Sequence, residues 1–220
     1  SEDEYSPGGV AGKRPDRAVI VYCQKLRECF GDIPIAIGGL EASLRRFAHY
    51  DYWDDGVRPS VLVDSGADLL MYGMGEHQIE EVCTRLAAGE KISDMHDVRG
   101  MCYLTEAVNT PLGAAQCPSF EQVRDSKTEY AKAVKIQYDW QDEVYGKTVI
   151  QRHGNMMLVQ NPPAYSLTTE ELDRIYALPY MRAYHPSYES QGGVPGIEEV
   201  RFSITHNRGC FGSVSYTHLT

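Results

Sequence analysis

Two short apolar runs, each closed by glycines and followed by a helical pattern, constrain the fold of this chain more than any other feature. The first run, IPIAIGG, occupies residues 33–39, and the second, ADLLMYGMGE, occupies residues 67–76. Continuous apolar runs of this length are typical of parallel strands that are buried on both faces of a sheet. The repeated order of strand, glycine turn and helix predicts an α/β fold, doubly wound around a mostly parallel sheet.

The glycine turns also predict where a ligand would bind. Ligands of doubly wound sheets lie beyond the carboxyl ends of the strands, so the candidate cofactor-binding residues are Gly38, Gly39, Gly73, Gly75 and Glu76. We expect Gly38 and Gly73 to lie at the ends of adjacent strands. Two alternatives remain open, because tight turns need glycine without any ligand and an acidic residue in the first turn favours the helix dipole.

The rest of the chain predicts further elements on both sides of these runs. Helical spacing predicts helices over residues 15–31, 41–50, 76–88 and 120–144. A capping box of Thr168 and Glu171 predicts the start of one more helix. Apolar or β-rich runs predict strands over residues 60–63, 100–104, 147–152, 155–160 and 200–205, and the third and fourth of these would form a hairpin.

These elements suggest three regions. Residues 1–117 would form the α/β domain, and residues 118–196 would form a region of helix, hairpin and linker. Residues 197–220 would begin a further domain.

The composition of the chain excludes several classes of protein. With 220 residues, 42% hydrophobic and 24% charged, it resembles an ordinary globular protein. The net charge of -10 argues against nucleic acid as the main partner, because nucleic-acid-binding proteins usually carry a basic face. No run approaches the roughly twenty apolar residues of a membrane helix. The six cysteines form no C-x-x-C pair, which favours reduced thiols and a cytoplasmic location.

Two further clusters contain residue types that bind ligands. The sequence HYDYWDD, residues 49–55, holds one histidine and three aspartates, but their spacing matches no standard metal site. A hydrogen-bonded turn is the favoured interpretation. Arg45 and Arg46 could meet a phosphate or carboxylate near the first glycine turn, and the favoured alternative is a pair of salt-bridged surface arginines.

The last patterned stretch brings a cysteine to a glycine-flanked loop. In IEEVRFSITHNRGCFG, residues 197–212, the apolar side chains of Val200, Phe202 and Ile204 alternate with polar ones, as in a half-buried strand that leads to Cys210. By itself, such a loop could hold a metal, a reactive thiol or nothing.

The sequence RGCFG at the end of a strand resembles the start of the catalytic barrel in radical S-adenosylmethionine (SAM) enzymes of the YgiQ type. Further blocks resemble the same family in order: GGLEASLRRFAHYDYWDD, DSGADLL, NPPA with TTEELD, and LPYMR followed by HPSYE. The α/β region is also similar to the cobalamin-binding-type domain that precedes many radical SAM barrels. The aspartate-histidine motif that ligates cobalt is not seen, so cobalamin is possible but unsupported.

The resemblance implies a parent enzyme that reductively cleaves SAM at a 4Fe-4S cluster held by three cysteines, with Cys210 as a metal ligand. The other two ligands would stand at Val214 and Thr217, whose side chains cannot replace a thiolate at iron. We therefore interpret the chain as a fragment that is truncated inside the cluster motif, is inactive alone and binds no stable cluster. The resemblance does not imply a substrate. The alternative is a free-standing α/β domain that binds a cofactor or a partner without catalysis.

Overall fold

The computed structural model describes residues 2–204 of the chain in two compact units. The sheet unit comprises residues 19–166, and the terminal unit combines residues 2–18 with residues 167–204. The boundary expected at residue 117 falls inside the sheet unit. The beginning of the chain therefore groups with the region that follows the hairpin, not with the sheet.

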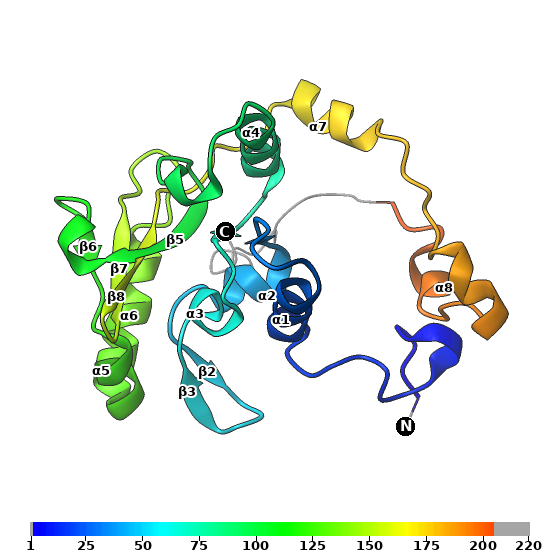
Figure 1. The fold of residues 1–220 in the computed structure, drawn as a ribbon, viewed down its shortest axis with the longest axis horizontal. Helices are drawn as coiled ribbons and strands as arrows, with labels where there is room; N and C mark the ends of the chain where they lie inside the picture. The colour runs from blue at the N-terminus through cyan, green and yellow to red at the C-terminus, as the bar shows by residue number, and fades with distance from the viewer. Residues whose placement is uncertain (1, 205–220) are drawn as a thin grey trace. The chain divides into compact units, whose positions relative to one another are not determined.

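A six-stranded sheet in the order β1-β4-β5-β8-β7-β6 forms the centre of the sheet unit. Figure 1 labels its strands β5, β6, β7 and β8. Its strands are β1 (Ala36–Ile37), β4 (Leu69–Met71), β5 (Met101–Glu106), β6 (Ala115–Gln116), β7 (Val149–His153) and β8 (Met156–Gln160). The β1–β4 and β6–β7 pairs are parallel, whereas the β4–β5, β5–β8 and β7–β8 pairs are antiparallel. The sheet is thus mixed rather than mostly parallel, because β5 runs antiparallel to β4 and the β7–β8 hairpin pairs with β5.

Helices cover both faces of this sheet, and the predicted α/β fold class is confirmed. One face packs against residues of α1 (Ala18–Phe30), α2 (Gly39–Leu44), α3 (Val61–Ser65), α5 (Phe120–Asp125) and α6 (Lys127–Asp139). The other face packs against α4 (Glu76–Ala87) and the 3-10 helix η2 (Ile92–Asp94), and a further 3-10 helix, η3 (Ala107–Asn109), follows β5. Side chains alternate between the faces, so Leu70 of β4 joins the first core and Leu69 and Met71 join the second.

Two predictions from periodicity are wrong because a serine caps a helix. The single helix expected over residues 120–144 is broken at Ser126, whose side chain accepts a hydrogen bond from the Glu129 amide and caps α6. The strand expected over residues 60–63 is α3, because the Ser60 hydroxyl accepts a hydrogen bond from the Leu62 amide. In both places the local cap outweighs the intrinsic preference of the surrounding residues.

The helix expected over residues 41–50 is also shorter than the sequence pattern predicts. It ends as α2 at Leu44, and the chain then enters a separate antiparallel hairpin of β2 (His49–Asp51) and β3 (Gly56–Arg58). The acidic cluster of HYDYWDD therefore lies in a hairpin and its turn rather than on a helix.

The terminal unit is held together by backbone hydrogen bonds between the two ends of the described chain. The Gly8 amide in η1 (Pro7–Gly9) donates to the Gly193 carbonyl at 2.8 Å, just after η4 (Pro186–Gln191). The Gly196 amide donates to the Glu4 carbonyl at 2.7 Å. These bonds join segments that lie about as far apart as the described sequence allows.

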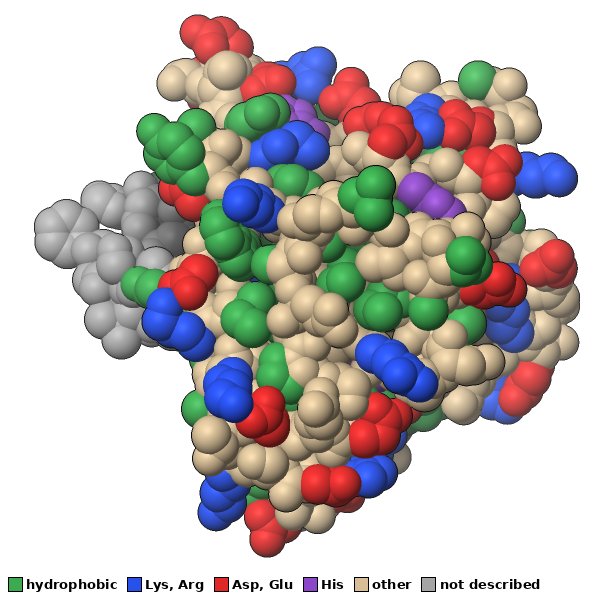
Figure 2. Space-filling model, turned by 90° about the vertical axis from the view of Figure 1, so that its left-hand side faces the viewer, with side chains coloured by type: hydrophobic (Ala, Val, Ile, Leu, Met, Phe, Trp, Pro, Cys, Tyr) green, Lys and Arg blue, Asp and Glu red, His purple; other side chains and the backbone are tan. Residues whose placement is uncertain are grey.

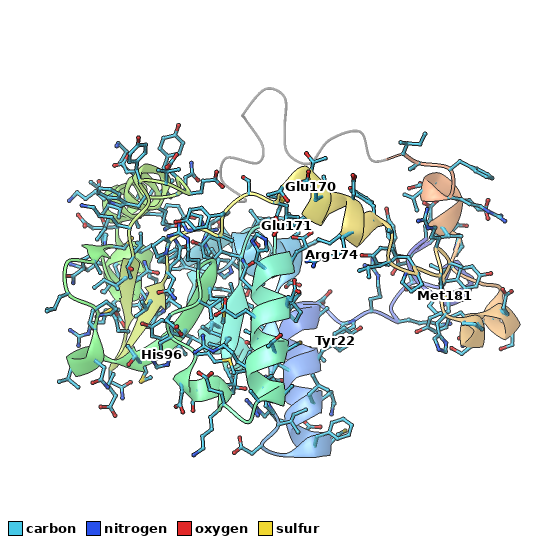
Figure 3. All side chains as sticks on the ribbon, turned by 90° about the horizontal axis from the view of Figure 1, so that it is seen from above. Tyr22, His96, Glu170, Glu171, Arg174 and Met181 are labelled. Carbon is cyan, nitrogen blue, oxygen red and sulfur yellow. The ribbon has the colours of Figure 1, made fainter. Side chains whose placement is uncertain are left out.

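The helix α7 (Thr169–Tyr176) of the terminal unit begins where the sequence predicts. Thr168 and Glu171 form the expected capping box, in which each side chain bonds the backbone amide of the other residue. Figure 3 shows Glu170, Glu171 and Arg174 projecting from α7, with Met181 in the segment that follows. The Met181 side chain is 85% exposed.

The terminal strand expected from residue 200 onward is wrong over its described part. Residues Ile197–Val200 form the short helix α8, and Phe202 and Ile204 are each 89% exposed. A strand needs a hydrogen-bonded neighbour, and none of the described strands pairs with this segment. Cys210 lies outside the described residues.

His153, at the end of β7, is buried as a neutral imidazole. It is 6% exposed and stacks on Phe120 with 5.7 Å between ring centroids. Burial lowers the pKa of His153 to about 4, and the nearby Glu121 carboxylate opposes this shift only in part.

We predict that His153 makes the free energy of unfolding depend on pH. Above about pH 6.5 the imidazole is neutral in both states. As the pH falls below that value the unfolded chain takes up the proton first, so stability declines until about pH 4, where the folded state is protonated too. The loss would reach at most about 3 kcal/mol. Urea unfolding at a series of pH values should give a shallower decline for His153→Leu than for the unchanged chain, and equal declines would contradict this account.

Gly8 occupies a position that a larger residue cannot enter. Its φ is +66°, and a Cβ at this position would lie 2.4 Å from the Gln191 carbonyl oxygen, a backbone atom. We predict that Gly8→Ala destabilises the terminal unit by about 2 kcal/mol or more, through strain and this clash. Gly12→Ala is the matched control, because Gly12 has φ +81° but nothing lies within 4 Å of the added methyl group. Hydrogen exchange of the Gly193 and Gly196 amides should accelerate more in Gly8→Ala, and equal rates in the two variants would refute the packing argument.

Candidate ligand site at the carboxyl edge of the sheet

The first two predicted glycine turns meet at one edge of the sheet. Strands β1 and β4 are parallel, with Ile37 beside Leu70, so Gly38 follows β1 directly next to Met71. A Cβ on Gly38 would lie 3.6 Å from the Met71 carbonyl oxygen, and the Gly73 amide donates to the Ser43 hydroxyl of α2 at 3.1 Å. The prediction that Gly38 and Gly73 lie at adjacent strand ends is confirmed.

The backbone conformation alone accounts for two of these glycines, without any ligand. Gly39 has φ +80° and Gly73 has φ +71°, a region in which side chains are unfavourable. Gly75 is the N-cap of α4, and Glu76 stands in its first turn. A ligand role for these residues, including Gly38, stays a prediction.

Strand β8 brings a third segment to the same edge. Because β4 and β8 are both antiparallel to β5, their carboxyl ends point the same way. A cavity of about 540 Å³ lies beyond these ends. Its lining residues are Tyr72, Gly73, Met74, Tyr138, Gln141, Asp142, Glu143, Pro163, Ala164, Tyr165 and Ser166. Of the residues predicted from sequence, Gly73 lines this cavity, whereas Gly38, Gly39, Gly75 and Glu76 do not.

Tyr72 connects the two strands that end at the cavity. Its hydroxyl donates to the Asn161 carbonyl, just after β8, at 2.6 Å. Its amide donates to the Gly100 carbonyl, just before β5, at 2.9 Å. The ring is 2% exposed, and burial raises the pKa of the Tyr72 phenol well above its usual range. Tyr72 is therefore a fixed neutral hydrogen-bond donor and not an acid or base.

Arg46 lies in the core beneath this edge, which corrects the expectation of a surface arginine. It is 5% exposed, donates to the Gln160 side-chain oxygen at 2.6 Å and lies 5.0 Å from the centroid of the Tyr72 ring. Burial lowers its pKa. Arg45, in contrast, forms the expected ion pair with Glu41 at 3.0 Å. The pattern RR thus combines one surface residue and one core residue.

The acidic cluster of residues 49–55 is a hydrogen-bonded hairpin, as favoured. Asp51 accepts from the Trp53 amide at 3.0 Å, Asp54 pairs with Arg58 at 3.0 Å, and Asp55 accepts from the Tyr50 hydroxyl at 2.6 Å. No group of three metal-ligating side chains occurs among residues 2–204.

The cysteines of the described chain do not fit an iron-sulfur cluster. Cys23, Cys102 and Cys117 are buried, whereas Cys29 and Cys83 are exposed. Burial raises the pKa of both Cys102 and Cys117 to about 12, so these thiols are protonated at neutral pH. Cluster ligands are thiolates. A cobalamin with a protein ligand to cobalt does not fit the cavity either, because no histidine is among its described lining residues.

Several cavity residues were not predicted from sequence. Tyr138 lies in the last turn of α6, and Tyr165 follows β8. Arg99 does not line the cavity, but it donates to the Pro163 and Glu143 carbonyls of two lining segments. The sequence predicts residues 118–196 as a region separate from the α/β domain, so neither the end of the helix nor the residues after the hairpin are expected at the sheet edge. The motif NPPAYS after an apolar run was the available signal.

The surface and helices limit other types of function. On the face shown in Figure 2, acidic and basic side chains of the described residues are interspersed, without a continuous basic field. None of the helices formed by the described residues has the length and apolar character that crossing a membrane requires.

These features define the class of the protein as an α/β domain with a ligand-sized cavity at the carboxyl edge of its sheet. Residues 1–203 match the family described as Radical SAM N-terminal, and the chain belongs to this family. The resemblance to radical SAM proteins is thereby confirmed.

Curated relatives carry the name UPF0313 protein. One from Clostridium botulinum (strain ATCC 19397 / Type A) is 56% identical over 219 residues, covering 100% of this chain and 34% of the relative. One from Methanocella arvoryzae is 52% identical over 220 residues, covering 100% of this chain and 36% of the relative. The chain therefore spans about a third of the length of these relatives. No solved structure matches it significantly.

We predict that Arg46→Lys destabilises the sheet unit by about 2–4 kcal/mol. A lysine ammonium cannot reproduce both the hydrogen bond to Gln160 and the contact with the Tyr72 ring, and it leaves a poorly solvated charge in the core. The neighbouring exchange Arg45→Lys is the control and should cost at most about 0.5 kcal/mol, because the ion pair with Glu41 is partly exposed. Urea denaturation measures both, and similar losses in the two variants would contradict the assignment of Arg46 to the core.

Proposed function

We propose that this chain is the N-terminal part of a cytoplasmic radical SAM iron-sulfur enzyme. The longer protein would reductively cleave SAM at a 4Fe-4S cluster, with Cys210 among the cluster ligands. The observation that carries the proposal is the match to the Radical SAM N-terminal family over residues 1–203. The greater length of the UPF0313 relatives leaves room for a catalytic domain in the parent protein.

In this proposal the sheet unit is an accessory domain that binds a small molecule at its carboxyl edge. In this role Gly38, Gly39, Gly73 and Gly75 would let a ligand approach the backbone, and Glu76 would offer it a carboxylate at the start of α4. Two strand ends with adjacent glycine turns support this role, because ligands in open α/β sheets bind at such edges.

The chain alone would be inactive in SAM cleavage. A site-differentiated cluster needs three thiolates, and the positions expected for the second and third ligands hold Val214 and Thr217. The described cysteines cannot supply them, since they form no cluster of ligands. SAM and the iron-sulfur cluster are therefore assigned to the longer protein.

The second candidate function is a binding domain without catalysis. The specific observation in its favour is the preformed cavity of about 540 Å³, which needs no residue outside the sheet unit. The two candidates differ in whether the longer protein binds a cluster.

We predict that anaerobic reconstitution with iron and sulfide loads a cluster on the full-length Clostridium botulinum relative but not on this chain of 220 residues. Cluster absorbance together with acid-labile sulfide is the measurement. SAM cleavage to 5'-deoxyadenosine by the reduced full-length relative is the second. A full-length relative without a cluster would overturn the enzymatic proposal, and a stable cluster on the chain alone would overturn the assignment of the missing ligands.

A further inference from the structure

The cavity beyond β4 and β8 is built by three segments that lie far apart in the sequence. Residues 72–74 follow β4, residues 138–143 end α6 and continue into a turn, and residues 163–166 follow β8. All three belong to the sheet unit. Its volume of about 540 Å³ lies within the range of pockets that bind small molecules.

Arg99 fixes two of these segments to each other. Its guanidinium donates to the Pro163 carbonyl at 2.9 Å and to the Glu143 carbonyl at 2.6 Å, and it lies 4.2 Å from the centroid of the Tyr165 ring. The Glu143 carboxylate in turn accepts from the amide and hydroxyl of Ser166, at 2.6 and 2.7 Å. The walls are therefore held in place without a ligand, which lowers the entropic cost of binding one.

The charges at the cavity select against anions. Asp142 and Glu143 line it, whereas no lysine or arginine is among the described lining residues. Backbone hydrogen bonds from Tyr145 and Val144 lower the pKa of Asp142, so this carboxylate is ionised at neutral pH. Two arginines contact the rings of lining residues, and both have other partners. Arg99 lies against Tyr165 and donates to the Pro163 and Glu143 carbonyls, and the buried Arg46 lies 5.0 Å from the centroid of the Tyr72 ring and donates to Gln160. A phosphate or carboxylate ligand would meet repulsion here.

The uncharged lining residues favour a flat ring. Tyr138 and Tyr165 are 51% and 58% exposed, and Met74, Pro163 and Ala164 add apolar surface. Aromatic side chains stack on heterocyclic bases, and the Gln141 amide offers both a donor and an acceptor for ring nitrogens. We propose that this cavity binds a planar nitrogen heterocycle, uncharged or cationic, of about the size of a nucleoside.

This inference concerns the sheet unit itself and is independent of SAM cleavage by the longer protein. Adenosine, AMP and ribose are suitable probes, because they separate the contribution of the ring from those of the phosphate and the sugar. In calorimetry with the full chain, adenosine should bind saturably, AMP should bind at least about tenfold more weakly at low salt, and ribose should not bind. Equal or tighter binding of AMP, binding of ribose, or no binding of adenosine up to its solubility limit would each overturn the proposal.

Substitutions locate the site. Tyr138→Leu should weaken adenosine binding about tenfold by removing a stacking ring, whereas Tyr138→Phe keeps the ring and should retain the affinity. Tyr180→Leu is the matched control, because Tyr180 is 53% exposed and lies in the terminal unit.

Fluorescence offers a second readout. Since the chain has 2 tryptophans, Trp53→Phe leaves Trp140, next to Gln141, as a fluorescent reporter that should respond to adenosine. Unchanged affinity in Tyr138→Leu, or a silent Trp140 during saturable binding, would place the ligand elsewhere and refute this site.

Discussion

The antiparallel pairing of β5 with β8 is the interaction on which the sheet unit depends. Five residue pairs, from Cys102–Gln160 to Glu106–Met156, join the half that contains β1 and β4 to the half that contains β6 and β7. The Gly100 amide extends this connection by donating to the Pro162 carbonyl at 2.7 Å. Without this pairing, the ends of β4 and β8 would not meet, and the cavity between their loops would have no walls.

The same pairing explains the polar groups buried in the core. Gln160 sits at the end of β8 with 1% exposure, and its side-chain oxygen accepts from Arg46, which also contacts the Tyr72 ring. Asn161 continues the connection, since its side chain donates to the His96 and Val98 carbonyls at 2.8 Å. Hydrogen bonds to charged or buried groups are costly to break, so these residues favour a single arrangement of the carboxyl edge.

The sequence predicts α1, α4, the buried strands β1 and β4 and the capping box of α7, because these follow from local periodicity and cap chemistry. It does not predict that the β7–β8 hairpin lies beside β5, because pairing between strands some fifty residues apart leaves no local pattern. For the same reason Gly38 and Gly73 could be predicted, since each follows its own strand, whereas Tyr138 and Tyr165 could not. At Ser60 and Ser126 the error is local, because a single serine hydroxyl caps a helix where the surrounding residues predict a strand or an unbroken helix.

The most direct test of this account is a nuclear Overhauser measurement across β5 and β8 in the isolated chain. The account predicts cross-strand contacts between Tyr103 and Val159 and between Thr105 and Met157, together with slow exchange of the β5 amides. Absence of these contacts, with β5 amides that exchange as rapidly as those of an unpaired segment, would contradict it.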